Sequence, residues 1–184
     1  MSIVLVSVTT SDSHIELILG GARSGKSRYA LQQALDSTQS VAWIATAEAH
    51  DDEMRERIAH HKAERPAHWL SIESPLLLAQ TLASTNSAFV VVDCLTLWLS
   101  NWLCLEDHSA WPAERQAFLD VLRHWPTDRQ LRLISNEVGF GIVPDNALAR
   151  YFRDEAGRLH QDIARIAHTV TLVVAGIPMT VKHG

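Results

Sequence analysis

The chain has only two cysteines among its 184 residues, Cys94 and Cys104, and both lie in or beside apolar runs. Two such cysteines provide neither a disulfide framework nor the ligand spacing of a zinc site, so we interpret them as reduced, buried thiols of a cytoplasmic protein. No apolar stretch reaches the roughly 18 residues that span a bilayer, so we predict no membrane span. The first residues also lack the positive region and small-residue cleavage site of a signal peptide.

Basic residues are few as well. Sixteen Lys and Arg residues face 21 Asp and Glu residues, which gives a net charge of −5. This charge offers no basic field for a phosphate backbone, so we expect no nucleic-acid partner. No repeat, low-complexity tract or Gly/Ser linker divides the chain, and its 47% hydrophobic and 20% charged residues are typical of a globular protein. We therefore predict one domain at residues 15–184, preceded by an extension at residues 1–14 that forms an extra edge strand or a tail.

Short apolar or β-branched runs alternate with longer stretches of helical periodicity. The predicted strands are Ile15–Leu19, Val41–Ala45, Trp69–Glu73, Ala88–Val92, Gln130–Ser135 and Thr169–Val174. The predicted helices are Lys26–Leu35, Asp51–Arg65, Pro75–Ala83, Leu95–Leu105, Pro112–His124 and Asp145–His168. Several strands, such as Phe89–Val92, are continuously apolar, which indicates strands covered on both faces of a parallel sheet. The pattern predicts an α/β, doubly wound, mostly parallel sheet flanked by helices, with ligands beyond the carboxyl ends of the strands.

A glycine-rich motif directly follows the first predicted strand and begins the first predicted helix. Its residues match G-x-x-x-x-G-K-[ST] at every fixed position, and they are Gly20, Gly21, Ala22, Arg23, Ser24, Gly25, Lys26 and Ser27. The glycines let backbone N–H groups converge on phosphate oxygens, Lys26 reaches the β- and γ-phosphates, and the Ser27 hydroxyl can ligate Mg²⁺. In this strand-to-helix context a chance glycine turn is the weaker interpretation. The sequence thus predicts a nucleoside triphosphate site in a P-loop NTPase-like (RecA-like) fold.

Asp93 follows the buried apolar run Phe89–Val92. Its position is that of the acidic residue that holds Mg²⁺ in P-loop proteins. An N-cap of the helix predicted from Leu95 is the alternative, and the two roles are compatible. Guanine-switch proteins are disfavoured, because Asn136–Gly139 does not match N-K-x-D and Asp93–Thr96 does not match D-x-x-G.

Two adjacent histidines, His60 and His61, lie in the predicted helix Asp51–Arg65. At about 100° per residue, His61 falls on the apolar stripe of this helix and is expected to point inward, whereas His60 lies on the polar face. Glu56 and Glu64 are each four residues from His60, so either carboxylate could approach its ring. From the pattern alone, a solvated surface histidine is favoured over a nucleophile or proton carrier at His60.

The motifs together resemble a known family. The following blocks appear in order: Gly20–Ser27, Ala45–Ala47, Asp52–Met54, Ile58–Lys62, Arg65-Pro66 with Trp69 and Glu73, Asp93–Trp98 and Asn136–Pro144. From about Ile15 to the C-terminus, the chain resembles the bifunctional adenosylcobinamide kinase/adenosylcobinamide-phosphate guanylyltransferase family of cobalamin biosynthesis. Many kinases share the glycine-rich motif, but the His-His-Lys and Asn-Glu-Val-Gly blocks are far more specific to this family. The resemblance does not extend to residues 1–14.

This resemblance implies two reactions on the aminopropanol arm of adenosylcobinamide. The γ-phosphoryl group of ATP or GTP first goes to the hydroxyl, and GMP from GTP then passes through a guanylylated histidine to give adenosylcobinamide-GDP. By match to the family motif, His60 is the guanylylated residue, and a neutral imidazole is nucleophilic near pH 7. Lys26 and the expected Mg²⁺ would offset charge on the departing pyrophosphate.

Further nucleotide contacts are implied by the same resemblance. They are Ala45, Thr46, Ala47, His61, Lys62, Ala63, Glu64 and Glu73, and Asp93 joins them on the strength of its position after the run Phe89–Val92. Helix capping and salt bridges remain alternatives for Lys62 and Glu64.

The block Asn136–Pro144 follows a strand and is expected to form a loop at the carboxyl edge of the sheet. Its candidate substrate-site residues are Asn136, Glu137 and Gly139. Glu137 either acts on the corrinoid hydroxyl, holds a water or only orders the loop. The resemblance also implies a trimer of P-loop domains with sites between subunits, so a homo-oligomer is expected. A plain P-loop kinase and a non-catalytic nucleotide-binding module remain the alternative functions.

Overall fold

The computed structural model describes residues 15–49 and 51–184, so the predicted extension at residues 1–14 lies outside the described residues. The strands are β1 (Ile15–Gly20), β2 (Val41–Ala45), β3 (Leu70–Glu73), β4 (Phe89–Asp93), β5 (Gln130–Asn136), β6 (Thr169–Val174) and β7 (Ile177–His183). The helices are α1 (Lys26–Asp36), α2 (Asp52–Ala63), α3 (Leu78–Ser84), α4 (Leu95–Leu103), α5 (Trp111–Arg123) and α6 (Ala147–Ile166).

The strands form one sheet with the order β3-β2-β4-β5-β1-β6-β7. All neighbouring pairs are parallel except β6 and β7, which are antiparallel. β5 lies between β1, which leads into the glycine-rich motif, and β4, which ends at Asp93. A strand inserted between these two is the arrangement of RecA-like P-loop proteins, so the predicted fold class is confirmed.

The strand register brings the predicted site segments to one edge of the sheet. Ala45 pairs with Asp93 on one side and with Glu73 on the other, and Gly20 pairs with Asn136. Because the parallel strands share a direction, their carboxyl ends form one edge, and the segments that follow them gather there.

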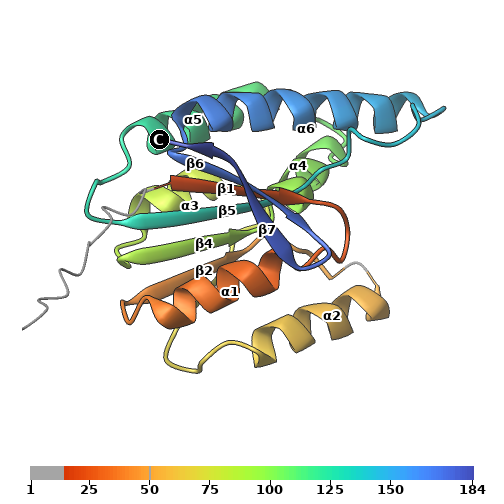
Figure 1. The fold of residues 1–184 in the computed structure, drawn as a ribbon. Helices are drawn as coiled ribbons and strands as arrows, with labels where there is room; N and C mark the ends of the chain where they lie inside the picture. Colours follow the sequence, from red (N-terminus) through yellow and green to blue (C-terminus); the bar gives the residue numbers. More distant parts are fainter. Residues whose placement is uncertain (1–14, 50) are drawn as a thin grey trace, which may run out of the picture.

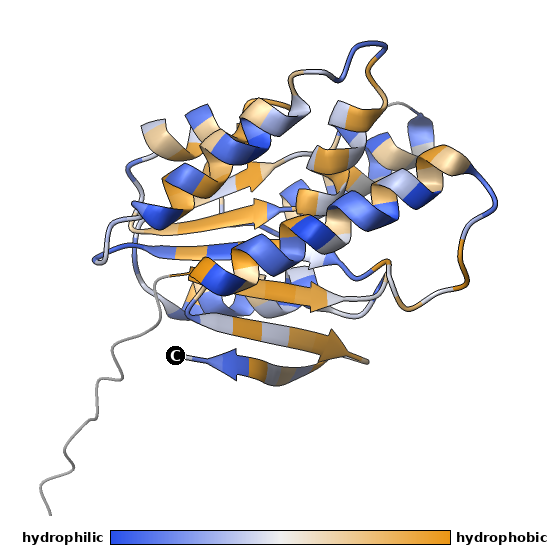
Figure 2. Cartoon of the chain, turned by 90° about the horizontal axis from the view of Figure 1, so that it is seen from above, coloured by the Kyte–Doolittle hydropathy of each residue, from blue (hydrophilic) through white to orange (hydrophobic). Residues whose placement is uncertain are grey.

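Helices cover both faces of the sheet. Figure 1 shows α1 and α2 on one side and α3, α4, α5 and α6 on the other. The larger core lies under the second group, where Trp98 packs against Trp111 and Phe118 with ring centroids 5.0 and 4.9 Å away. The smaller core lies under α1 and contains Trp43 and Trp69. The largely apolar strands that run between these layers are visible in Figure 2.

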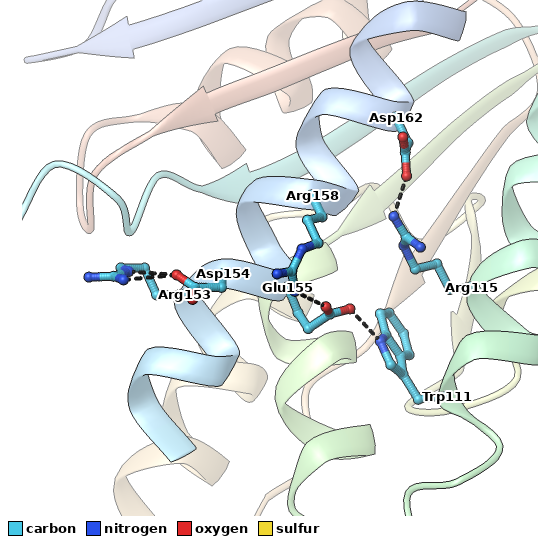
Figure 3. A network of polar contacts seen from close by, with 7 residues as sticks. All are labelled: Trp111, Arg115, Arg153, Asp154, Glu155, Arg158 and Asp162. Atoms are coloured by element: carbon cyan, nitrogen blue, oxygen red, sulfur yellow. Dashed lines mark hydrogen bonds and ion pairs between the residues drawn. The ribbon is translucent and has the colours of Figure 1, made fainter. Parts of the chain in front are cut away.

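Polar contacts fasten α6 to α5 (Figure 3). Trp111 Nε1 donates to one carboxylate oxygen of the buried Glu155 at 3.0 Å, and Arg158 donates to the other at 2.6 Å. Arg115 of α5 forms an ion pair with Asp162 of α6. Because both oxygens of Glu155 have a partner, the cost of burying this carboxylate is offset.

Three features of the fold differ from the sequence-based expectation. β7 was not predicted as a strand. It contains Pro178, which an edge strand tolerates because one side of it has no partner strand. Cys104 is exposed rather than buried, because α4 ends one residue before it, whereas Cys94 is buried as expected. Trp69 precedes β3, and its ring stacks on Trp43 with centroids 6.3 Å apart.

Within residues 15–49 and 51–184, no helix has the length and apolarity needed to cross a membrane.

Candidate active site

The glycine-rich motif forms the turn from β1 into α1. Gly25 is the N-cap of α1 and has φ +99°, a left-handed conformation that glycine adopts without steric cost. The ammonium group of Lys26 folds back over the turn and donates to the carbonyl oxygens of Gly20 at 2.8 Å and Gly21 at 2.6 Å. Burial lowers the pKa of Lys26 from its ordinary value. The turn therefore gathers backbone N–H groups, a helix N-terminus and a lysine, which suits phosphate oxygens.

The turn between β6 and β7 supports this motif from behind. Gly176 N donates to the carbonyl oxygen of Ser24 at 2.8 Å. A Cβ on Gly25 would lie only 3.1 Å from Gly176 Cα, so the two turns pack directly on each other. Sequence patterns did not indicate this support, because it depends on the unpredicted strand β7.

Asp93 lies beside the motif at the end of β4. Ser27 Oγ donates to Asp93 Oδ1 at 3.4 Å. Burial raises the pKa of Asp93, against the opposing influence of His61, Ser27 and Arg65. These two side chains present hard oxygen donors of the kind that Mg²⁺ prefers, and Mg²⁺ in phosphate sites usually takes one or two protein ligands. In the described part of the chain there is no group of three or more His, Cys, Asp or Glu side chains that could hold a metal ion.

Thr46 links the ends of β2 and β4. Its hydroxyl donates to Cys94 O at 2.7 Å and accepts from Cys94 N at 2.9 Å. The side chain is fully buried, so Thr46 shapes the strand ends rather than facing a ligand.

Helix α2 carries the two histidines. It begins where Asp51 accepts a hydrogen bond from Met54 N at 2.7 Å. The side chain of His60 is 75% exposed and that of His61 is 36% exposed, which confirms that His61 is the more inward of the two. Glu64 Oε1 lies 3.5 Å from His60 Nε2, and Glu64 Oε2 lies 3.7 Å from His61 Nδ1. One carboxylate is thus placed to orient both rings.

A cavity of about 800 Å³ joins the glycine-rich motif, the strand ends and α2. The predicted site residues that line it are Ala22, Arg23, Ser24, Gly25, Lys26, Ser27, Ala45, Ala47, His60, His61, Lys62, Glu64, Glu73, Asp93 and Asn136. The predicted residues outside this lining are Gly20, Gly21, Thr46, Ala63, Glu137 and Gly139. The structure therefore brings His60 and the glycine-rich motif to one cavity, although they are far apart in the sequence.

The cavity is more basic than the chain as a whole. Its described lining contains five lysine and arginine residues and three acidic residues, namely Arg23, Lys26, Arg28, Lys62 and Arg65 against Glu64, Glu73 and Asp93. The difference is 5 − 3 = +2, whereas the whole chain carries −5. A polyanion is therefore favoured in this cavity.

Several lining residues were not identified as site residues from the sequence. They are Arg28, Leu31, Trp43, Met54, Ile58, Arg65, Ser71, Ile72, Cys94, Leu97, Ile134, Ala175 and Gly176. The only signal for Arg65 was its place in the block with Pro66, and no local pattern marked Trp43, which reads as an ordinary strand residue.

The loop after β5 meets the cavity through Asn136 alone among its predicted residues. Glu137 Oε1 accepts from Gly139 N at 2.6 Å, so this carboxylate folds onto its own loop. Its other oxygen lies 3.9 Å from Nδ1 of the buried His160, whose Nε2 is 2.7 Å from Ser135 Oγ. Further along the loop, the side chain of Phe140 is exposed.

Comparison with known proteins agrees with these motifs. The family model described as CobU, cobinamide kinase / cobinamide phosphate guanyltransferase, matches residues 16–181. The chain is 52% identical over 169 residues to the bifunctional adenosylcobalamin biosynthesis protein CobP of Pseudomonas aeruginosa, covering 91% of this chain and 96% of that protein. It is 40% identical over 181 residues to the bifunctional adenosylcobalamin biosynthesis protein CobU of Escherichia coli K12, covering 90% of this chain and 98% of that protein.

Among solved structures, the RadB recombinase matches with a TM-score of 0.49 and 18% identity, over 86% of this chain and 73% of that chain. The fold assignment rests instead on the strand order. The matches in sequence cover nearly the whole described chain and include the blocks around both histidines and the loop after β5. The chain therefore belongs to the cobinamide kinase / cobinamide phosphate guanyltransferase family.

Proposed function

We propose that this chain carries out two successive transfers. It first phosphorylates the aminopropanol hydroxyl of adenosylcobinamide with ATP or GTP, and it then attaches GMP from GTP through a guanylylated His60. The observation that carries the proposal is the shared cavity, which both His60 and the glycine-rich motif line. A nucleotide whose β- and γ-phosphates bind the motif would extend its α-phosphate into the cavity that His60 lines.

In the first transfer, the hydroxyl oxygen of adenosylcobinamide attacks the γ-phosphorus. The bond between this phosphorus and the β–γ bridging oxygen breaks, the nucleoside diphosphate leaves, and the hydroxyl proton passes to solvent. The N–H groups of the motif and the Lys26 ammonium stabilise the charge on the leaving group. Because Asn136 lines the cavity and Glu137 bonds to its own loop, we assign substrate contact to Asn136 and loop ordering to Glu137.

In the second transfer, an unprotonated ring nitrogen of His60 attacks the α-phosphorus of GTP. The bond to the α–β bridging oxygen breaks, and pyrophosphate leaves. A phosphate oxygen of adenosylcobinamide phosphate then attacks the same phosphorus, the P–N bond breaks, and free His60 is regenerated. Glu64, 3.5 Å from His60 Nε2, is placed to hold the ring during both attacks.

The oxygen donors of Ser27 and Asp93 fit Mg²⁺, and we propose that these two side chains hold it. The ion would supply charge neutralisation at the triphosphate oxygens.

The test is incubation with α-labelled GTP and Mg²⁺, followed by denaturing separation of the protein. We expect acid-labile, alkali-stable label on the wild-type chain and none on His60→Ala. His68→Ala is the matched control, because His68 is an exposed histidine outside the cavity lining and should keep full labelling. A wild-type chain without label that still phosphorylates adenosylcobinamide is a plain kinase, and a chain with neither activity is a nucleotide-binding module.

We also propose a cytoplasmic homo-oligomer, a trimer by family resemblance, in which residues 15–184 act as one catalytic domain. Exposed apolar side chains along the edge strand β7, at Ile177, Met179 and Val181, support a subunit contact.

A further inference from the structure

Arg65 follows α2 and lies on the wall of the cavity. Its guanidinium carbon lies over the face of the Trp43 ring, 4.6 Å from the centroid, which is the geometry of a cation–π contact. Burial lowers the pKa of Arg65, yet an arginine stays protonated at any physiological pH. The cavity therefore holds a permanent positive charge whose position is set by a rigid aromatic ring.

Among residues 15–49 and 51–184, no hydrogen bond or ion pair reaches the side chain of Arg65. Lys26, by contrast, donates to the carbonyl oxygens of Gly20 and Gly21. In the described part of the chain, the indole N–H of Trp43, which is 2% exposed, has no hydrogen-bond partner either. The buried indole N–H is an exception to the rule that buried donors are paired, whereas the guanidinium of the half-buried Arg65 opens on the cavity, where a bound ligand can supply its acceptors.

The position of Arg65 favours phosphate over a base as that ligand. Arg65 lines the same cavity as Lys26 of the glycine-rich motif and Asp93 at the end of β4. The cavity lining is basic as a whole, and a guanidinium fork matches two phosphate oxygens at once.

We propose that Arg65, held by Trp43, is a phosphate-binding residue of the guanylyl transfer and donates to non-bridging phosphate oxygens. This deepens the proposed function and rests on it. Two phosphates could supply these oxygens, the α-phosphate of the nucleotide and the phosphate monoester of the acceptor.

The first experiment measures binding of GMP and of guanosine by calorimetry to wild-type, Arg65→Gln, Arg65→Lys and Arg55→Gln chains. Arg55 is the matched control, because it is an exposed arginine on α2 that pairs with Asp52 outside the cavity. If Arg65 binds the nucleotide phosphate, Arg65→Gln weakens GMP binding by roughly 10- to 100-fold and leaves guanosine binding unchanged. Arg65→Lys keeps the charge and the stem but loses the fork, so it retains only part of the affinity.

The second experiment follows transfer of labelled GMP from the protein to adenosylcobinamide phosphate. If Arg65 binds the acceptor phosphate, Arg65→Gln takes up label normally but raises the KM for this acceptor by roughly 10-fold or more, with partial rescue in Arg65→Lys. Unchanged GMP binding together with unchanged transfer overturns the proposal. An equal loss of guanosine and GMP affinity also overturns it, because it assigns Arg65 to the base.

Failure of the Arg65 proposal can be distinguished from failure of the proposed function. If the wild-type chain takes no label from GTP, the guanylyl transfer fails, but the comparison of GMP with guanosine still tests whether Arg65 contacts a nucleotide phosphate. Thermal unfolding of each variant distinguishes a lost contact from a lost fold, and Arg65→Lys provides the milder substitution.

Discussion

At the scale of single residues, Gly20 shows how closely the phosphate-binding turn packs on the sheet. A Cβ at this position would lie 2.4 Å from Val173 O and 2.6 Å from Ser24 Oγ. The first of these atoms belongs to the backbone of β6 and cannot turn aside. Its neighbour Gly21 has no atom within 4 Å of the corresponding position. The two adjacent glycines therefore differ in their surroundings. Gly20 lets the turn pack closely on β6, whereas Gly21 faces open space.

We expect Gly20→Ala to lower the free energy of unfolding by roughly 1–3 kcal/mol, because the new methyl group forces the turn away from β6. Gly21→Ala should change it by no more than about 0.5 kcal/mol, because its methyl group enters open space. Urea unfolding of both variants without nucleotide measures the difference. Equal losses in the two variants would contradict this account of the turn.

At the scale of elements, α6 and the loop after β5 are joined by a buried chain of polar groups. His160 of α6 bonds to Ser135 Oγ at 2.7 Å, and Ser135 Oγ lies 3.0 Å from Thr96 Oγ1 of α4. Glu137 is the charged group that faces His160, at 3.9 Å. Burial lowers the pKa of His160 below 6.5, and the influence of Glu137 only partly opposes it.

Because the pKa of His160 is lower in the folded chain, the unfolded chain binds more protons as the pH falls below about 6.5. The stability that a neutral His160 provides is therefore complete above this pH and is lost progressively below it. We expect the free energy of unfolding of the wild type to fall between pH 7.5 and 5.5 more steeply than that of His160→Asn. His124→Asn, at an exposed histidine, is the control and should follow the wild type. Parallel curves for wild type and His160→Asn would refute the role of burial.

At the scale of the whole molecule, the cavity lies between a closely packed segment, the glycine-rich motif, and a loosely packed one, helix α2. The glycine-rich motif lies between β1 and α1 and is supported by the β6–β7 turn. Helix α2 is different, because none of its described side chains is fully buried, whereas α4 buries six residues. An element with so few buried contacts opens at a low free-energy cost.

We expect a non-hydrolysable GTP analogue with Mg²⁺ to slow amide hydrogen exchange in Asp52–Ala63 by about tenfold or more, because the ligand adds contacts to a helix that has few. Exchange in Leu95–Leu103 should change little, since that helix is already buried. Hydrogen-exchange mass spectrometry measures both segments in one experiment. Protection of the glycine-rich motif with unchanged exchange in α2 would contradict this prediction, because it would show that the bound nucleotide does not contact the helix that carries His60.

Much of the fold and part of the candidate site were predictable from local sequence patterns. The apolar strands, the glycine-rich motif and the helices, each to within three residues at both ends, follow from patterns spanning a few residues, and the family assignment is confirmed by the family model. The inward placement of His61 followed from helical periodicity. β7 escaped prediction because its edge position, which admits Pro178, is a property of the sheet rather than of the segment.

The sequence by itself determined the phosphate-binding turn, because the steric freedom of glycine and the charge of Lys26 act within that turn. Only the tertiary structure decided that His60 shares a cavity with it, that Glu137 bonds to its own loop, and that the guanidinium of Arg65 lies over the ring of Trp43 on the wall of that cavity. Each of these depends on which faces of distant segments meet across the sheet. Such meetings are set by strand order and packing, and no stretch of a few residues contains that information.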